Sequence, residues 1–364
     1  IGTPVGLAIE GIVEGGVYDF FKGRGYTDQQ ALSETFFPGI ISGRPEGVPW
    51  YGGAESLLEK ELVGDEPGRQ FQPKVAQYVD ALKDQERFQA ALEAHEQALA
   101  IKPNFAEAHY NKGNVLKAQG KLDEAIVAFK QVLKFDKQDI FGASLQLASI
   151  TNDKIPDKTP EEFLRAFYAK KADTWNEKAF ENAGYNGNIL IKRAYEQVSR
   201  YQNRIDILDL GCGTGTLASF VRPYARKLNG VDISPEMLIR AKESRLYDNI
   251  FTEDIECHLK YNSTNYDIVI AAAVIFHFSK LENMFELVTK RLRKGGLFIF
   301  SVFEDNKVDN SLNSFLMYSH SSQYIKSLAD NLSCKIVYQE KGIHEYHKHA
   351  PVEAVIYVFE TKNK

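Results

Sequence analysis

Ile207-Leu208-Asp209-Leu210-Gly211-Cys212-Gly213-Thr214-Gly215 is the stretch of sequence that decides the fold. Its apolar run predicts a buried β-strand that ends near an acid and breaks into a glycine loop. About twenty residues later, Leu228-Asn229-Gly230-Val231-Asp232-Ile233 predicts a second strand that also ends at an acid. Two neighbouring strands that each end at a carboxylate predict a ligand pocket at one edge of a sheet.

The sequence around this motif alternates between strand and helix patterns. Strands are expected at 205–210, 228–233, 267–273, 296–303, 334–340 and 352–360. Helices are expected at 161–175, 189–200, 216–226, 235–245, 280–293 and 321–332. This alternation predicts an α/β fold with a doubly wound, largely parallel sheet.

The spacing of the glycines narrows the choice of ligand. Gly211, Gly213 and Gly215 are spaced GxGxG, whereas a nicotinamide-dinucleotide site prefers GxGxxG around a pyrophosphate. Glycines allow the backbone to approach a ligand closely, and a helix start presents free amides to a carboxylate. Asp209 can meet a cationic amino group, and Asp232 can accept both hydroxyls of a ribose. An amino acid joined to an adenosine has these groups, so S-adenosyl-L-methionine is the predicted cofactor.

The region 160–364 resembles the class I S-adenosylmethionine-dependent methyltransferases. More narrowly, it resembles predicted bacterial methyltransferases that carry tetratricopeptide repeats at their N-terminus. Besides the two motifs already quoted, the resemblance rests on Phe167-Tyr168-Ala169, Ser234 to Leu238, Leu246-Tyr247-Asp248, Glu253-Asp254-Ile255, Tyr266 to Ala272 and Arg293 to Phe298. It implies a Rossmann-like methyltransferase sheet whose last strand is antiparallel.

The resemblance also implies roles for individual residues. Asp209 would lie near the amino group of the cofactor, and Asp232 would hold its ribose. The other implied cofactor-binding residues are Gly211, Cys212 and Gly213 along the methionine moiety, Ile233 and Met237 beside the adenine, Asp254 with Ile255 at the adenine amino group, Ala271 and Ala272 behind the sulfonium, and Tyr168 folded over the cofactor. Cys212 is expected to pack in the loop rather than to act as a nucleophile, because no basic partner stands near it in the sequence.

The end of the fourth strand bears on the acceptor. Ala271-Ala272-Ala273-Val274 stands where enzymes that methylate exocyclic base amines or glutamine amides carry an Asn/Asp-Pro-Pro-Tyr motif. No Pro-Cys pair follows, so methylation at cytosine C5 is disfavoured as well. His277 lies just past this strand and is the candidate catalytic base, since histidine titrates near neutral pH. A histidine simply packed between Phe276 and Phe278 is the alternative.

A second group of histidines lies in His344-Glu345-Tyr346-His347-Lys348-His349. On a strand, His347 and His349 would share one face. No cysteine or further carboxylate completes a known ligand spacing, so no metal site is predicted. Two interpretations of this segment remain: a solvated hairpin, or a loop that contacts the substrate.

Residues 71–150 predict helical tetratricopeptide-like repeats. Ala91-Leu92 and Ala98-Leu99 recur as Ala125-Ile126 and Val132-Leu133, an offset of 34 residues each time. Gly113 is expected where two helices approach closely, with Ala125 small and Phe129 bulky. So short an array cannot bury a continuous core alone. The segment therefore serves either as a structural collar or as a groove for a protein partner.

Residues 1–70 form a third region, an extension of unknown role that holds more than half of the glycines. Short helical patches are expected at 7–21 and 54–62. The remaining residues, 151–364, are expected to form the methyltransferase domain. The sequence begins at Ile1 rather than Met, so a trimmed chain is expected and a lost signal peptide stays open.

The bulk composition restricts the class of partner. The net charge of −5 favours neither nucleic acid nor an anionic membrane. The three cysteines are scattered, which favours a reducing, cytoplasmic location. No apolar run is long enough for a membrane span. The leading hypothesis is methyl transfer to an oxygen or nitrogen of a small molecule. The alternatives are a protein methyltransferase that recruits its target through the repeats and an adaptor that binds the cofactor without turnover.

Overall fold

The computed structural model describes residues 72–173, 175, 185–198, 204–305, 311–313, 315–347 and 350–362, with side chains from residue 87 onward. The chain divides into two compact units after Phe135. The extension predicted for residues 1–70, with its helical patches, lies outside the described residues. The domain boundaries predicted after residues 70 and 150 stay predictions. No helix in the described ranges has the length and apolarity that crossing a membrane requires.

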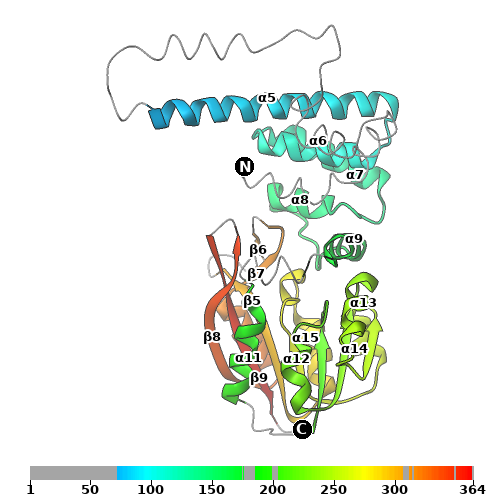
Figure 1. The fold of residues 1–364 in the computed structure, drawn as a ribbon, viewed down its shortest axis with the longest axis vertical. Helices are drawn as coiled ribbons and strands as arrows, with labels where there is room; N and C mark the ends of the chain where they lie inside the picture. Colours follow the sequence, from blue (N-terminus) through cyan, green and yellow to red (C-terminus); the bar gives the residue numbers. More distant parts are fainter. Residues whose placement is uncertain are drawn as a thin grey trace. The chain divides into compact units, whose positions relative to one another are not determined.

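The described part of the first unit is helical, as predicted (Figure 1). It consists of α5 (Gln72–Ile101), α6 (Ala106–Ala118) and α7 (Leu122–Phe135). A Cβ atom on Gly113 of α6 would lie 2.7 Å from the Phe129 ring of α7, which confirms the predicted close approach of these helices. Tyr110 stacks obliquely on the same ring, with the centroids 5.7 Å apart. Glycine therefore lets a large aromatic side chain fill the space between α6 and α7.

In the described part of the second unit, helices α8, α9 and α11 precede the first strand, and strands and helices then alternate (Figure 1). In chain order the elements are α8 (Ala143–Thr151), α9 (Glu161–Lys171), α11 (Gly187–Val198), β1 (Ile205–Leu210), α12 (Ala218–Val221), β2 (Ala225–Asp232), α13 (Pro235–Glu243), β3 (Asn249–Thr252), α14 (Ile255–Tyr261), β4 (Tyr266–Ala271), α15 (Glu282–Arg291), β5 (Leu292–Glu304), β6 (Ser311–Leu312), β7 (Tyr318–His320), α16 (Ser322–Asn331), β8 (Cys334–His347) and β9 (Ala350–Thr361). Single 3-10 turns follow α12 and β4, at Arg222–Tyr224 and Ile275–His277.

The sheet confirms the predicted fold class. Strands β3, β2, β1, β4 and β5 lie side by side in that order, and all four pairings are parallel. The last strand, β9, runs antiparallel to β5 and also pairs with β8, while β5, β7 and β6 form a short extension. The strand order reverses between β1 and β4. In doubly wound sheets such a switch point lies at the carboxyl ends of the strands and binds ligands.

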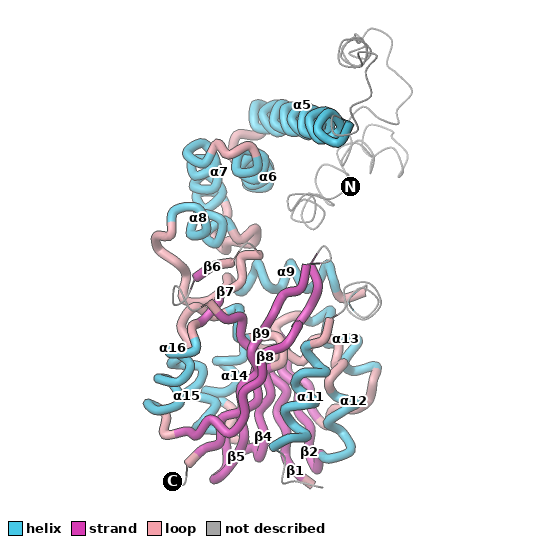
Figure 2. Tube along the Cα trace, turned by 90° about the vertical axis from the view of Figure 1, so that its left-hand side faces the viewer, coloured by secondary structure: helices cyan, strands magenta, loops and turns pink. Residues whose placement is uncertain are grey.

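Helices cover both faces of the sheet, with α14, α15 and α16 on one side and α11, α12 and α13 on the other (Figure 2). The side chains of β1 alternate between these faces, as a strand requires. Leu208 and Leu210 join the core under α14 and α15, and Ile207 joins the core under α11 and α12. Asp209 therefore points to the same face as Ile207.

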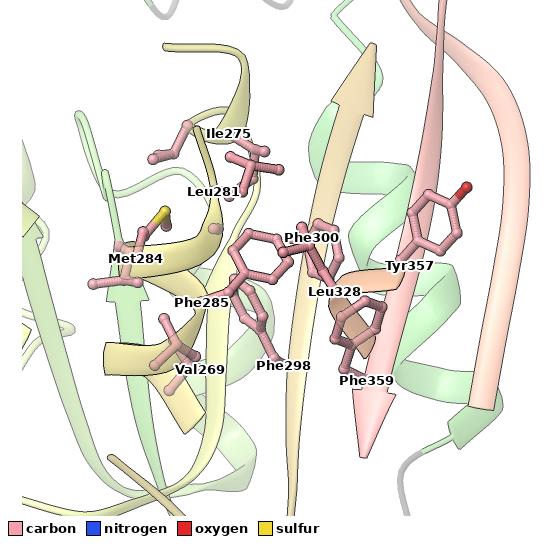
Figure 3. Close-up of a cluster of buried hydrophobic side chains, with 14 of the residues drawn as sticks. Val269, Ile275, Leu281, Met284, Phe285, Phe298, Phe300, Leu328, Tyr357 and Phe359 are labelled. Atoms are coloured by element: carbon pink, nitrogen blue, oxygen red, sulfur yellow. The ribbon is translucent and has the colours of Figure 1, made fainter. Parts of the chain in front are cut away.

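The core beneath α15 and α16 is rich in aromatic rings (Figure 3). Phe285 of α15 packs edge-on against Phe298 and Phe300 of β5, with centroids 5.1 and 4.9 Å apart. Phe359 of β9 reaches the same group, 5.0 Å from Phe300. Each such pair adds about 1 kcal/mol beyond its buried area. The antiparallel strand β9 is thereby fixed to the parallel part of the sheet.

Several elements differ from the sequence prediction. The helix expected at 216–226 ends after Val221, because Pro223 has no amide hydrogen and enters a 3-10 turn. Strand β8 continues to His347 rather than ending at 340, and register shifts after Ile336 and Ile343 interrupt the pattern that would have marked it. The short strand β3 and the short helix α14 were not predicted.

Candidate functional site

The glycine loop follows β1 directly, and two hydrogen bonds fasten it to β2. The amides of Gly211 and Cys212 both donate to the Val231 carbonyl, at 2.8 and 3.1 Å. Gly211 has φ +65° and Gly213 has φ +54°, a region that residues with a Cβ rarely adopt. A Cβ on Gly211 would also lie 2.1 Å from Cγ2 of Val274, whereas one on Gly213 would meet nothing within 4 Å. The loop is therefore closed on the Gly211 side and open at Gly213.

Asp232, the last residue of β2, turns its carboxylate into this loop. One oxygen accepts from the Gly213 amide at 2.8 Å and the other from the Ser234 amide at 2.9 Å. Burial raises the pKa of this carboxyl group, and the backbone amides oppose that shift. The two amides fix the orientation of the carboxylate, and each oxygen retains a lone pair for a ligand.

Asp209 lies beside it at the end of β1 and is buried. Its carboxylate accepts a hydrogen bond from the hydroxyl of Tyr247 at 2.7 Å. Burial, together with the nearby charge of Asp232, raises the pKa of Asp209 to about 7, although the hydrogen bond from the Tyr247 hydroxyl lowers it. Within the described residues, neither Asp209 nor Asp232 forms a salt bridge. The positive charge of Arg165 lowers the pKa of Asp232 and so offsets part of the cost of its burial. Two buried acids without a salt bridge stay costly unless a cationic or hydroxyl-rich ligand meets them.

Helix α9 contributes to the same site from the segment before the sheet. The guanidinium of Arg165 donates to the Ile233 carbonyl at 2.6 Å. The Tyr168 hydroxyl lies 2.8 Å from Nε2 of His277. Burial lowers the pKa of His277 to about 4 and raises that of Tyr168. Tyr168 therefore keeps its proton and His277 is neutral, and the tautomer of His277 sets which of the two donates in their hydrogen bond. Nδ1 of His277 has no partner among the described residues.

The remaining predicted cofactor residues lie around the carboxyl ends of β1, β2 and β4. Cys212, Met237, Ala271 and Ala272 are buried, and Ile233 is half-buried. Ile255 packs into the core under α14. The roles inferred for these residues stay predictions.

Asp254 has partners of its own before any ligand binds. One oxygen caps α14 by accepting from the amides of Glu256 and Cys257, each at 3.0 Å. The other oxygen accepts from Nζ of Lys158 at 3.0 Å. An aspartate at a helix N-cap commonly makes these bonds. Its predicted contact with an adenine amino group would have to use the remaining lone pairs.

His344 belongs to the histidine group near the chain end, and the structure buries it. Its ring packs edge-on against Tyr185, Phe276 and Phe303, with centroids 5.1 to 6.0 Å apart. Burial lowers its pKa to about 4. The solvated-hairpin interpretation is therefore wrong at this position. The His347 side chain and His349 lie outside the described residues, and the described part of the chain holds no group of three metal-ligating side chains.

Three residues near the carboxylates were not given a role by the sequence. Tyr247 supports Asp209. Tyr185, ahead of α11, and Glu345, on β8, are half-buried near Tyr168, and the loss of solvent around them raises the pKa of both. The charges of Glu345 and Asp209 raise the pKa of Tyr185 further. Only Tyr247 could have been found from the sequence, because it lies in the quoted motif Leu246-Tyr247-Asp248. Tyr185 and Glu345 come near the carboxylates through tertiary packing alone.

Family comparisons agree with this arrangement. A family model described as a methyltransferase domain matches residues 208–300. Models described as a TPR repeat and a tetratricopeptide repeat match residues 80–120 and 106–139. The chain carries a methyltransferase domain preceded by tetratricopeptide repeats. The glycine loop, Asp209, Asp232 and His277 all lie inside the matched methyltransferase segment.

Individual relatives share about a third or less of their residues with this chain, over part of its length. A probable S-adenosylmethionine-dependent methyltransferase of Saccharomyces cerevisiae is 32% identical over 174 residues, 42% of this chain and 57% of the relative. A ubiquinone biosynthesis O-methyltransferase of Pectobacterium carotovorum is 28% identical over 104 residues, 28% of this chain and 44% of the relative. The chain spans about half the length of these curated relatives. Among solved structures, a 1,6-didemethyltoxoflavin-N1-methyltransferase of Burkholderia thailandensis matches with 14% identity and a TM-score of 0.44, over 58% of this chain and 93% of the other.

The two glycines of the loop offer a matched pair of substitutions. Gly211→Ala and Gly213→Ala both place a Cβ at positive φ, which costs about 1–2 kcal/mol. Only Gly211→Ala also drives a methyl group into Val274, which adds about 1–3 kcal/mol. We expect Gly211→Ala to destabilise the methyltransferase domain more than Gly213→Ala, measured by hydrogen exchange of the β1 and β4 amides under native conditions. Equal losses would contradict the packing described for the loop.

Proposed function

We propose that this protein binds S-adenosyl-L-methionine and transfers its methyl group to an oxygen or nitrogen of a small molecule. The observation that carries the proposal is the pair of buried carboxylates, Asp209 and Asp232, which lack a salt-bridge partner among the described residues. An ammonium group could form an ion pair with Asp209, and two ribose hydroxyls could donate hydrogen bonds to Asp232. The open space at Gly213 lets a ligand approach the loop backbone.

The side chains beside the glycine loop match the polar groups of the cofactor best. Asp209 would accept from the cofactor's ammonium group, and Asp232, held by two backbone amides, would accept from the ribose hydroxyls. The other proposed cofactor-binding residues are Gly211, Cys212, Gly213, Ile233, Met237, Asp254, Ile255, Ala271, Ala272 and Tyr168. When bound, the cofactor supplies an electrophilic methyl group on a positively charged sulfur.

The chemical work left to the protein is positioning and exclusion of water. Transfer of a methyl group is an in-line displacement, so the acceptor atom must be held on the far side of the methyl group. Tyr168, Tyr185 and Glu345 are half-buried near the carboxylates and would limit the access of solvent to the site. Their two hydroxyls and one carboxylate would orient an acceptor by hydrogen bonds.

A small-molecule acceptor is favoured by the net charge of −5 and by a relative named as a ubiquinone biosynthesis O-methyltransferase. A protein acceptor is the second candidate, because the matched repeats could recruit one. Neither nucleic acid nor a membrane is proposed as a partner. All three cysteines are free, in keeping with the cytoplasmic location that we propose.

The cofactor assignment is tested by calorimetry with S-adenosyl-L-methionine. Asp232→Ala removes the carboxylate that would accept both ribose hydroxyls, so we expect the dissociation constant to rise about 100-fold or more. Glu243→Ala, which removes an exposed acid outside the site, is the control and should leave binding unchanged. Equal binding by the Asp232 variant would remove the basis for the pocket.

The acceptor class is then tested by transfer of a labelled methyl group to metabolite and protein fractions. Label in the metabolite fraction supports the proposal, and label in protein alone supports the second candidate. Binding without label in either fraction would support an adaptor that does not turn over.

We also propose His277 as the group that removes the acceptor's proton. Its ring is neutral near pH 7, and its Nε2 already holds the hydroxyl of Tyr168, which an acceptor hydroxyl or amine would replace. With the labelled acceptor, His277→Gln should lower turnover about 100-fold and leave cofactor affinity unchanged. His258→Gln, at a buried histidine bound to Glu253, is the matched control. Unchanged turnover by the His277 variant would mean that transfer needs no base here.

A further inference from the structure

The Tyr247 ring packs beneath the glycine loop, close to Gly215 and Gly230. The residue lies between α13 and β3, and its ring extends along the face of the sheet that carries Asp209. A Cβ on Gly230 of β2 would lie 2.9 Å from Cε1 of this ring, and a Cβ on Gly215 would lie 3.0 Å from Cε2. A methyl group at either glycine would displace the ring. Two backbone segments thus approach closely enough to hold the Tyr247 ring between them.

The hydroxyl at the end of this ring reaches the ligand-facing acid. It donates to one carboxylate oxygen of Asp209 at 2.7 Å, a distance typical of a hydrogen bond to a charged acceptor. In the described part of the chain, Asp209 makes no other side-chain hydrogen bond and no salt bridge. The second oxygen therefore has its orientation set by this single contact.

We propose that Tyr247 is a positioning residue, which fixes Asp209 in the orientation and charge state that the cofactor's ammonium group requires. This inference rests on the proposed function, because it assigns Asp209 to that group. Tyr247 itself would not touch the cofactor. It would act from the packed layer between the sheet and α13, with Cys212, Leu238 and Ala241 as its neighbours.

The groups that face Asp209 determine how its charge depends on pH. They are Tyr247 from the segment before β3, Asp232 from β2, Cys212 from the loop and Tyr185 from the segment before α11. Asp232 disfavours a second negative charge, whereas the Tyr247 hydroxyl is the group that favours it. Loss of this hydroxyl would raise the pKa of Asp209 above about 7. Near neutral pH the carboxyl group would then be protonated and unable to pair with an ammonium group.

Tyr247→Phe tests this, since it keeps the ring between Gly215 and Gly230 and removes only the hydroxyl. Binding of S-adenosyl-L-methionine would be measured by calorimetry from pH 6 to pH 9 for both proteins. We expect the variant to bind about tenfold more weakly at pH 7, with the loss shrinking toward pH 9 as Asp209 ionises. The ratio of the two dissociation constants cancels titration of the cofactor's own amino group.

Two further variants separate positioning from mere packing. Tyr266→Phe removes another buried tyrosine hydroxyl, one that bonds to Asn229 below the site, and should leave the pH profile unchanged. In an Asp209→Asn background, Tyr247→Phe should add no pH-dependent loss, because residue 209 no longer titrates.

The possible outcomes distinguish this inference from the proposed function. A wild-type chain that does not bind S-adenosyl-L-methionine would overturn the proposed function. A wild-type chain that binds, with a Tyr247→Phe loss that is absent or equal at every pH, would overturn the positioning role alone. Carboxyl NMR of Asp209 in the ligand-free protein gives an independent check, since the variant should titrate at higher pH than the wild type.

Discussion

The site depends on the burial of two like-charged groups at the ends of adjacent parallel strands. Gly211 and Cys212 both donate to the Val231 carbonyl, so the loop after β1 is fastened to the end of β2. That contact holds Asp209 and Asp232 close enough for each to raise the cost of ionising the other. Backbone amides and one tyrosine hydroxyl offset part of this cost. A ligand with a positive charge and hydroxyl groups would remove the rest.

The segments that complete the site come from distant parts of the sequence. Arg165 and Tyr168 lie on α9, ahead of the sheet, and contact Ile233 and His277. Glu345 lies on β8, next to a histidine whose ring is buried among aromatic side chains. Each segment is anchored by its own contacts, so the proposed acceptor side of the site would depend on the packing of the whole domain.

The positions of Asp209 and of the glycine loop could be predicted from the sequence because their determinants are local. Strand alternation places Asp209, and glycine spacing marks the loop where a Cβ is excluded at Gly211. Local chemistry also explains why α12 ends before Pro223 and why one oxygen of Asp254 caps α14. The acceptor side could not be predicted, since Tyr185, Tyr247 and Glu345 reach the carboxylates only through tertiary packing. The contact of Gly113 with Phe129 is also tertiary, but it could be predicted because the spacing of the repeat places these two residues opposite each other.

Asp209 is a buried, partly protonated acid that would ionise when it pairs with the ammonium group of the cofactor. This ionisation is tested most directly by proton release on binding of S-adenosyl-L-methionine, measured by calorimetry in buffers of different ionisation enthalpy. Since the pKa of Asp209 is about 7, roughly nine-tenths of a proton should be released at pH 6. The release should decline as the pH rises to 8, because Asp209 is then ionised before binding and the cofactor's own amino group takes up protons when it binds as ammonium. Binding at pH 6 without proton release would contradict the account.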